Sequence, residues 1–159
     1  MNTDKTFRVL LGLAVAFVFA VGTRPARSAP EADTPYTRIA KLAGYISDGE
    51  TVGALEAFDK NGKRYAVIAE DIQALAAQTE VLCSITVVED KEAEDDASDI
   101  HHLDLDWFMT LKSRSDGGLV ERRRERVAMT MERIAGKNGK SWRITSLSPE
   151  TILAPITVK

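Results

Sequence analysis

Hydrophobic residues change their spacing once along the chain, at about Val81. Before that point, apolar residues recur every three or four positions, which is the period of an amphipathic helix. This spacing predicts three helices, over residues 34–47, 50–59 and 64–80. Thr34 and Pro35 suit the N-cap and first turn of the first helix, and Gly49 suits its end. The first residues of the third segment also fit a short strand.

From Val81 onward, apolar residues alternate with polar ones and β-branched residues become frequent, as is typical of strands. The predicted strands cover residues 81–90, 100–113, 119–135 and 141–148, with a final edge strand or tail at 150–154. Gly-containing turns separate the last three strands. Helices followed by a run of strands predict an α+β fold, with the helices on one face of an antiparallel sheet.

The segment DIHHLDLDWFMTLK, residues 99–112, could be a chemical site or a strand with one charged face. In a strand, the odd-numbered residues from 103 to 111 form an apolar face, and His102, Asp104 and Asp106 share the other. Successive members of this set lie about 6.5–7 Å apart. Metal ligands converge to about 2.0–2.5 Å from one ion. We therefore expect a strand whose His and Asp residues face outward, and no metal site.

The turn at residues 114–118 sets the pairing of this strand with the next one. It places Asp106 opposite Arg126, in a ladder of opposite charges worth roughly 0.2–1 kcal/mol per pair. Toward the hairpin end the apolar face becomes charged, at Arg123 and Glu125. Either this end overhangs the helices and its charges are solvated, or it forms the mouth of an internal pocket.

The arrangement resembles the nuclear transport factor 2-like superfamily, which includes SnoaL-like and ketosteroid-isomerase-like proteins. The resemblance lies in two N-terminal helices broken at SDGE, the ending ALEAFDK and a third helix before the strands. It continues in the strands LDLDWFMTL and RRRERVAMTMERI and in the closing GKSWRITSLSP. It covers residues 34–155.

This resemblance implies three N-terminal helices packed in the concave face of a strongly curved antiparallel sheet of four to six strands. Such a cone-shaped, cystatin-like roll has a pocket inside, and many members dimerise through the sheet. The superfamily holds isomerases and dehydratases as well as proteins without catalysis. No catalytic constellation of its enzymes can be matched residue by residue in this chain.

Apolar and aromatic side chains at core spacing are the candidates for lining that pocket. The predicted ligand-binding residues are Tyr45, Phe58, Leu105, Trp107, Met109, Met129 and Trp142. Residues of these types at such spacing also form ordinary cores. Glu125 and Tyr45 are the candidates for catalysis, because burial would raise the pKa of a pocket carboxylate toward that of a useful base. The sequence indicates no cofactor.

The N-terminus has the pattern of a signal peptide. Two basic residues precede an apolar run over 9–22, too short to span a membrane comfortably, and cleavage after Ser28 leaves small residues at the required positions. We expect a signal peptide (1–28), a linker (29–33), the folded domain (34–155) and a tail (156–159). This predicts a periplasmic or secreted protein without stable membrane association; an uncleaved anchor is the alternative.

The net charge and the cysteine content limit the possible binding partners and disulfides of the protein. Removing residues 1–28 takes away four basic residues and one acidic residue, which lowers the net charge from −3 to −6. Nucleic acid is therefore not an expected partner, since binding phosphates needs a basic surface. Cys83 is alone in an apolar run, so we expect a buried structural thiol and no internal disulfide.

Together these features predict an exported SnoaL-like protein of non-catalytic type, and a homodimer through the sheet. It would bind a small apolar ligand or a protein partner through its cone pocket or its sheet. The alternative is an isomerase- or dehydratase-type enzyme that uses a pocket carboxylate.

Overall fold

The computed structural model of the protein describes residues 32–95, 97–136 and 139–157. The predicted leader and its cleavage site at Ser28 lie outside the described residues. Within the described ranges, no helix is long and apolar enough to cross a membrane.

Helix α1 (Pro35–Asp48) begins and ends where its sequence predicts. The Oγ1 atom of Thr34 accepts a hydrogen bond from the Thr37 amide (3.1 Å), and Pro35 occupies the first turn. At the other end, Gly49 has a φ of 71°, a left-handed conformation that glycine adopts without the steric clash of a Cβ.

Helix α2 (Thr51–Leu55) is shorter than predicted, because the chain after it pairs with the sheet. The Ile144 amide donates to the carbonyl oxygen of Ala57 (2.8 Å), and the Asp59 amide donates to that of Ile144 (3.0 Å). These bonds to a strand replace the helical ones. Helix α3 (Tyr65–Gln78) is helical from its first residues, so the alternative of a short strand there is wrong.

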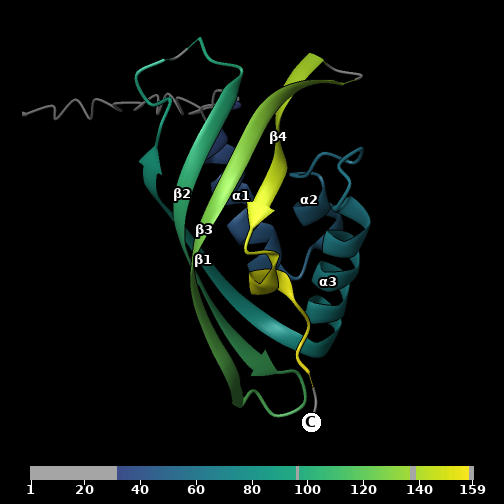
Figure 1. Cartoon of the computed structure of the whole chain (residues 1–159). Coiled ribbons are helices and arrows are strands. Elements are labelled where there is room, and N and C mark those ends of the chain that lie inside the picture. The colour runs from purple at the N-terminus through teal and green to yellow at the C-terminus, as the bar shows by residue number, and fades with distance from the viewer. Residues whose placement is uncertain (1–31, 96, 137–138, 158–159) are drawn as a thin grey trace, which may run out of the picture. The chain divides into compact units, whose positions relative to one another are not determined.

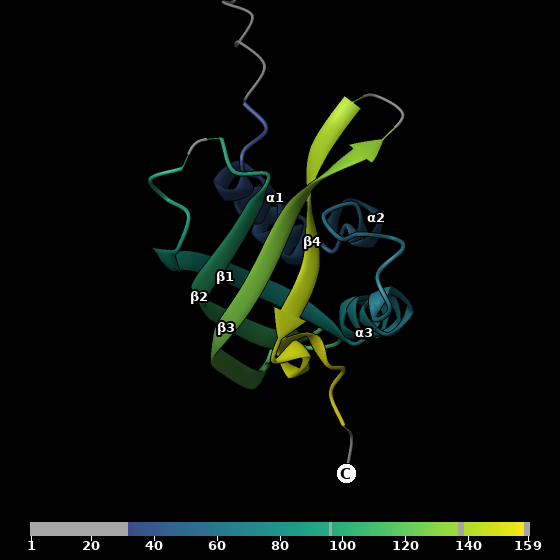
Figure 2. The same cartoon turned by 45° about the horizontal axis from the view of Figure 1, so that its top comes forward.

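Four antiparallel strands follow the helices in the spatial order β1-β2-β3-β4. They are β1 (Thr79–Asp90), β2 (Ile100–Ser113), β3 (Leu119–Gly136) and β4 (Gly139–Ser148), and a short 3-10 helix, η1 (Glu150–Leu153), follows. The sheet curves strongly and the helices lie along its inner side (Figures 1 and 2). This confirms the predicted α+β order, with an antiparallel sheet of four strands.

The pairing of β2 with β3 has the predicted register, with Asp106 opposite Arg126. The neighbouring pairs contain bulges that the sequence did not reveal, at Val88 in β1 and at Thr145 in β4. A bulge adds one residue to a strand, so beyond it the opposite set of residues faces inward. This matters at the end of β1, where the bulge turns Asp90 toward the inner side.

The inner face of the sheet and the helices enclose the core. On β2, the odd-numbered residues from 103 to 111 are at most 1% exposed, as the alternation predicts. Helices α1 and α3 contribute Leu42 and Leu75, which are also buried. Fully burying one such side chain contributes about 1.5–3 kcal/mol, so this layer dominates the stability of the fold.

Other parts of the chain cover the two edges of the sheet. At β1, the Cys83 amide donates to the Oγ atom of Ser47 in α1 (3.0 Å). At β4, the segment around Phe58 pairs with Ile144. Each of these contacts occupies part of an edge that would otherwise be open to pairing with another strand. We call the face of the sheet turned away from the helices its outer face.

Candidate functional site

The residues predicted to bind a ligand fill the interior of the fold. Six of the seven are at most 3% exposed: Phe58, Leu105, Trp107, Met109, Met129 and Trp142. Tyr45 is half-buried and lines a cavity of about 10 Å³ between the helices, β1 and η1. That volume holds about one water molecule. At these residues the structure has a packed core, except that Phe58 also lines a hollow of about 210 Å³ beside α3 and β4.

The two catalytic candidates lie in separate places. Tyr45 packs against α2, where a Cβ added to Gly53 would come within 2.6 Å of the tyrosine ring. Glu125 lies on β3 opposite Trp107 and is half-buried. It does not line the small cavity beside Tyr45. The structure therefore does not combine them in one hollow.

The sequence left two alternatives for the charges at the hairpin end of the inner face, a solvated overhang or the mouth of a pocket, and Arg123 fits neither. Its side chain is only 10% exposed. The guanidinium donates to the carbonyl oxygens of Ile152 (3.1 Å) and Ala154, and its Nη2 atom lies 3.0 Å from a Glu121 oxygen. Arg123 thus holds the C-terminal segment against the sheet.

Cys83 has the environment of a structural thiol. The indole Nε1 atom of Trp107 donates to its sulfur at 3.2 Å. Burial raises the pKa of the thiol to about 12, more than this hydrogen bond lowers it. A thiol that stays protonated at neutral pH is a poor nucleophile.

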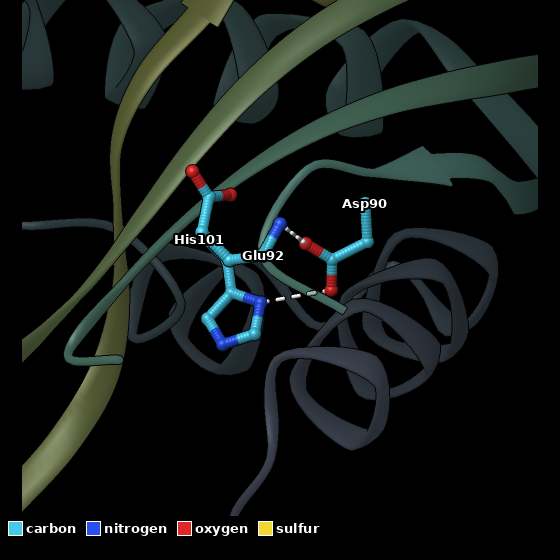
Figure 3. A group of neighbouring side chains, drawn as sticks. All are labelled: Asp90, Glu92 and His101. Carbon is cyan, nitrogen blue, oxygen red and sulfur yellow. Dashed lines mark hydrogen bonds and ion pairs between the residues drawn. The ribbon is translucent and has the colours of Figure 1, made fainter. Parts of the chain in front are cut away.

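A polar cluster lies where β1 ends and β2 begins, and the sequence reasoning missed it (Figure 3). The Nδ1 atom of His101 is 2.8 Å from Oδ2 of Asp90, and the hydroxyl of Tyr36 in α1 donates to the same oxygen at 2.6 Å. The Glu92 amide donates to the other oxygen, Oδ1, at 3.0 Å. Three segments of the chain therefore meet at the Asp90 carboxylate.

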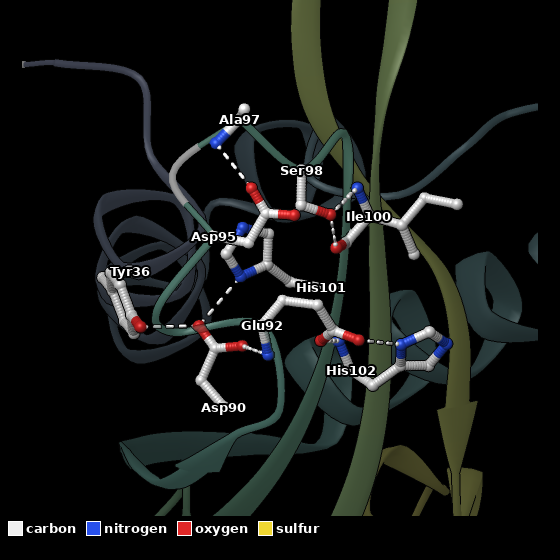
Figure 4. A network of polar contacts seen from close by, with 9 residues as sticks. All are labelled: Tyr36, Asp90, Glu92, Asp95, Ala97, Ser98, Ile100, His101 and His102. Atoms are coloured by element: carbon white, nitrogen blue, oxygen red, sulfur yellow. Dashed lines mark hydrogen bonds and ion pairs between the residues drawn. The ribbon is translucent and has the colours of Figure 1, made fainter.

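The neighbouring histidine has a carboxylate partner of its own (Figure 4). Glu92 accepts hydrogen bonds from the His102 amide (2.6 Å), and its other oxygen is 2.8 Å from Nδ1 of the His102 ring. We name the five residues Tyr36, Asp90, Glu92, His101 and His102 the β1–β2 cluster. Its two histidines point to opposite faces of the sheet.

Burial and hydrogen bonding oppose each other at the acids of this cluster. Burial by itself would raise the pKa of Asp90, but the hydrogen bonds from Tyr36, His101 and the Glu92 amide outweigh it and lower that pKa. The His102 amide and ring lower the pKa of Glu92. Both acids are therefore carboxylates at neutral pH, ready to accept hydrogen bonds or to bind a cation.

His101 corrects the expectation that the histidines and aspartates of β2 face outward. It is 7% exposed and lies on the inner face, in phase with Leu103. Its ring meets Trp142 edge to face, with centroids 5.0 Å apart. Because side chains alternate along a strand, the sequence of β2 already placed His101 on the same face as Leu103. The inward turn of Asp90, which provides the partner, depends on the bulge at Val88.

The outer face of the sheet carries the predicted ladder of opposite charges, but Asp106 pairs with a different arginine from the one predicted. Asp106 forms two hydrogen bonds with Arg124 (3.1 and 2.7 Å), diagonally across from it, and not with Arg126 directly opposite. Phe108, Leu82 and other apolar side chains lie exposed on the same face. This face therefore mixes both charges with exposed apolar groups.

A conserved protein from Planctomyces limnophilus has a similar structure, with a TM-score of 0.57 at 11% identity over 70% of this chain and 88% of its own. A nuclear transport factor 2-like superfamily protein from Salmonella enterica aligns with a TM-score of 0.51 at 15% identity, over 77% of this chain and 89% of its own. The chain has a nuclear transport factor 2-like fold.

A variant of a Mycobacterium tuberculosis protein of unknown function shares this nuclear transport factor 2-like fold. Its TM-score is 0.53 at 13% identity, over 70% of each chain. No family model and no curated protein matches the sequence. Identities this low establish the fold alone, and the nuclear transport factor 2-like fold supports many unrelated functions.

Proposed function

We propose that this protein is an exported, non-catalytic binding module that forms a homodimer through the outer face of its sheet. The observation that carries the proposal is the exposure of Leu82, Val88 and Phe108 on that face, at 57%, 49% and 38%. Apolar side chains gathered on one face of a sheet lose contact with water when a second surface covers them.

The charges on this face suit a second copy of the same chain. A two-fold dimer brings one patch against itself, so the patch must carry groups that complement each other. Here Asp104 and Asp106 lie in a row on β2, and Arg124 and Arg126 lie in a row on β3. A copy rotated by half a turn can set the arginines of one chain against the aspartates of the other.

The size of the face agrees with this use. If only ten residues of each strand are counted, the length of the shortest strand β4, four strands about 4.8 Å apart form a face of roughly 600 Å² before the relief of the side chains is counted. A specific interface buries about 800 Å² per partner. The whole sheet, and not one corner of it, would have to take part.

The packed interior favours this surface over the cone pocket. A small apolar ligand would need a hollow at Leu105, Trp107 and Met109, which are completely buried among other side chains. An isomerase-type reaction would need a carboxylate and a donor facing one hollow, and Glu125 and Tyr45 do not share one. The predicted leader supports placing the module outside the cytoplasm.

Sedimentation equilibrium of the wild type against Phe108→Asp tests the proposal. The matched control is Val67→Asp, which puts the same charge at a residue of similar exposure (39%) on α3. We expect the wild type and the control to sediment as dimers and Phe108→Asp as a monomer with an unchanged circular dichroism spectrum. A monomeric wild type at micromolar concentration, or a dimeric Phe108→Asp, would overturn the proposal.

A further inference from the structure

We propose that Asp90, Glu92 and His101 form a binding site for a divalent cation of the Zn²⁺ type. One ligand atom from each of these residues lies within 4.8 Å of the other two. They come from the end of β1, the loop after it and the start of β2. This proposal departs from the expectation that the chain has no metal site, and it does not depend on the dimer.

The spacing of the three atoms is close to that of a coordinated ion. Zn²⁺ binds His and carboxylate ligands at about 2.0–2.2 Å, so ligands in a tetrahedral arrangement stand about 3.4 Å apart. His101 Nδ1 and Asp90 Oδ2 are already closer than that, at 2.8 Å. These two atoms would therefore move slightly apart and exchange their hydrogen bond for bonds to the ion, and Glu92, whose side chain is 25% exposed on the loop, would rotate toward them.

Each of the three ligands is oriented by a partner outside the set, which is the usual construction of a metal site. The Tyr36 hydroxyl holds Asp90, and the ring and amide of His102 hold Glu92. The ion would take the lone pair of Asp90 Oδ2 that accepts from His101 in the absence of metal, while the Tyr36 hydroxyl keeps the other. His101 is fixed by its edge-to-face contact with Trp142. Figure 4 shows the hydrogen bonds that hold Asp90 and Glu92.

The donor set selects the class of ion. An imidazole nitrogen with two carboxylates suits Zn²⁺ and similar transition metals, whereas Ca²⁺ and Mg²⁺ prefer oxygen ligands alone. Nδ1 of His101 would bind the ion in the tautomer that carries its proton on Nε2. Three protein ligands leave a fourth position for water.

A bound ion would join the end of β1 to the start of β2 and close the acidic loop between them. Because the ligands lie in this arrangement only in the folded chain, binding adds to the stability of the fold. We therefore expect the midpoint of thermal unfolding, Tm, to rise with added ZnCl₂ and to fall back with EDTA.

Calorimetric titration of the EDTA-treated protein with ZnCl₂ tests the site. We expect saturable binding of one ion per chain, no measurable binding in His101→Gln, and binding at least about tenfold weaker in Glu92→Gln. His102→Gln, which removes only an orienting partner, should also weaken binding by about tenfold. The matched control is Glu94→Gln, which removes the same charge from an exposed residue of the loop and should leave the affinity unchanged.

Three results would overturn the proposal: no heat with ZnCl₂, equal losses in Glu92→Gln and Glu94→Gln, or equally tight binding of CaCl₂. The first would leave the β1–β2 cluster as a set of hydrogen bonds alone, and the second would indicate general attraction to the acidic loop. If His101→Gln fails to fold, Glu92→Gln and His102→Gln at the surface still decide the question. Phe108→Asp should bind Zn²⁺ like the wild type, so failure of the dimer and failure of the metal site are distinguishable.

Discussion

On the inner face of β2, Leu105, Trp107 and Met109 are completely buried, whereas His102 and Phe108 on its outer face are exposed to solvent. These residues belong to one strand, in which the odd-numbered side chains point inward and the even-numbered ones outward. The inner side chains exchange water for close packing, which contributes directly to stability. The outer side chains keep their contact with water and are available to a partner. Neighbouring residues in the chain therefore have separate consequences when changed.

The largest effect should come from Trp107→Ala. Removing this buried indole leaves a cavity and takes a hydrogen bond from the Cys83 sulfur, so we expect a loss of about 3–5 kcal/mol in the free energy of unfolding, measured with urea. Its neighbour Phe108→Ala should change that free energy by less than about 0.5 kcal/mol in the monomer.

The two variants also test the dimer. A loss in Phe108→Ala that grows with protein concentration would locate the effect at the interface between copies. Equal, concentration-independent losses in both variants would show that the assignment of the two faces is wrong.

An intermediate effect is expected for Arg123→Ala against Arg122→Ala. Arg123 faces inward and binds the carbonyl oxygens of η1 and the residue after it, whereas Arg122 is exposed on the outer face. Hydrogen bonds to charged groups contribute about 1.5–3 kcal/mol, so Arg123→Ala should lose about that much and Arg122→Ala almost nothing.

Hydrogen exchange locates the Arg123 effect. The amide of Ala154 should exchange faster in Arg123→Ala, because the arginine no longer holds the C-terminal segment. Unchanged exchange there would mean that the segment is held by the burial of Ile152 and Leu153 alone.

The smallest effect on stability concerns the thiol of Cys83. Its pKa is raised from 9.0 to about 12, so at pH 8 the native protein should react with iodoacetamide about a thousand times more slowly than the protein in urea. The folded state holds this proton more tightly than the unfolded state. Stability is therefore unaffected below the unfolded pKa near 9 and declines as the pH rises above it.

Moving the thiol to the outer face provides the control. The double variant Cys83→Ser with Ser84→Cys places it at an exposed position and should react almost as fast folded as unfolded. Rapid alkylation of the native wild type would contradict the inward orientation of Cys83.

The alternation of β2 and its turn sequence predicted which residues are buried and which pair with β3. Both are local properties: side chains alternate along any strand, and a tight turn sets the register of the two strands that it joins. The same alternation placed His101 on the inner side, although the charged appearance of the segment led to the opposite expectation. The alternation indicated that His101 faces inward, whereas the charged composition of the segment favoured an outward orientation.

The partners of the inner polar groups could not be predicted in this way. Asp90 reaches His101 only because a bulge at Val88 reverses the phase of β1. Arg123 binds carbonyl oxygens about thirty residues further along the chain. Whether the interior is filled or hollow likewise depends on how the helices pack against the sheet. None of these features produces a periodic pattern of apolar and polar residues in the sequence.

The sequence by itself determined the order of helices and strands and the two faces of β2, because these follow from the repeat of the backbone. Its motifs also carried the resemblance to the nuclear transport factor 2-like superfamily. Only the tertiary structure decided that the predicted lining residues form a core, that Arg123 anchors the C-terminal segment, and that a tyrosine, two acids and two histidines meet between β1 and β2. These depend on contacts between residues far apart in the chain, whose geometry is set when the sheet curves around the helices.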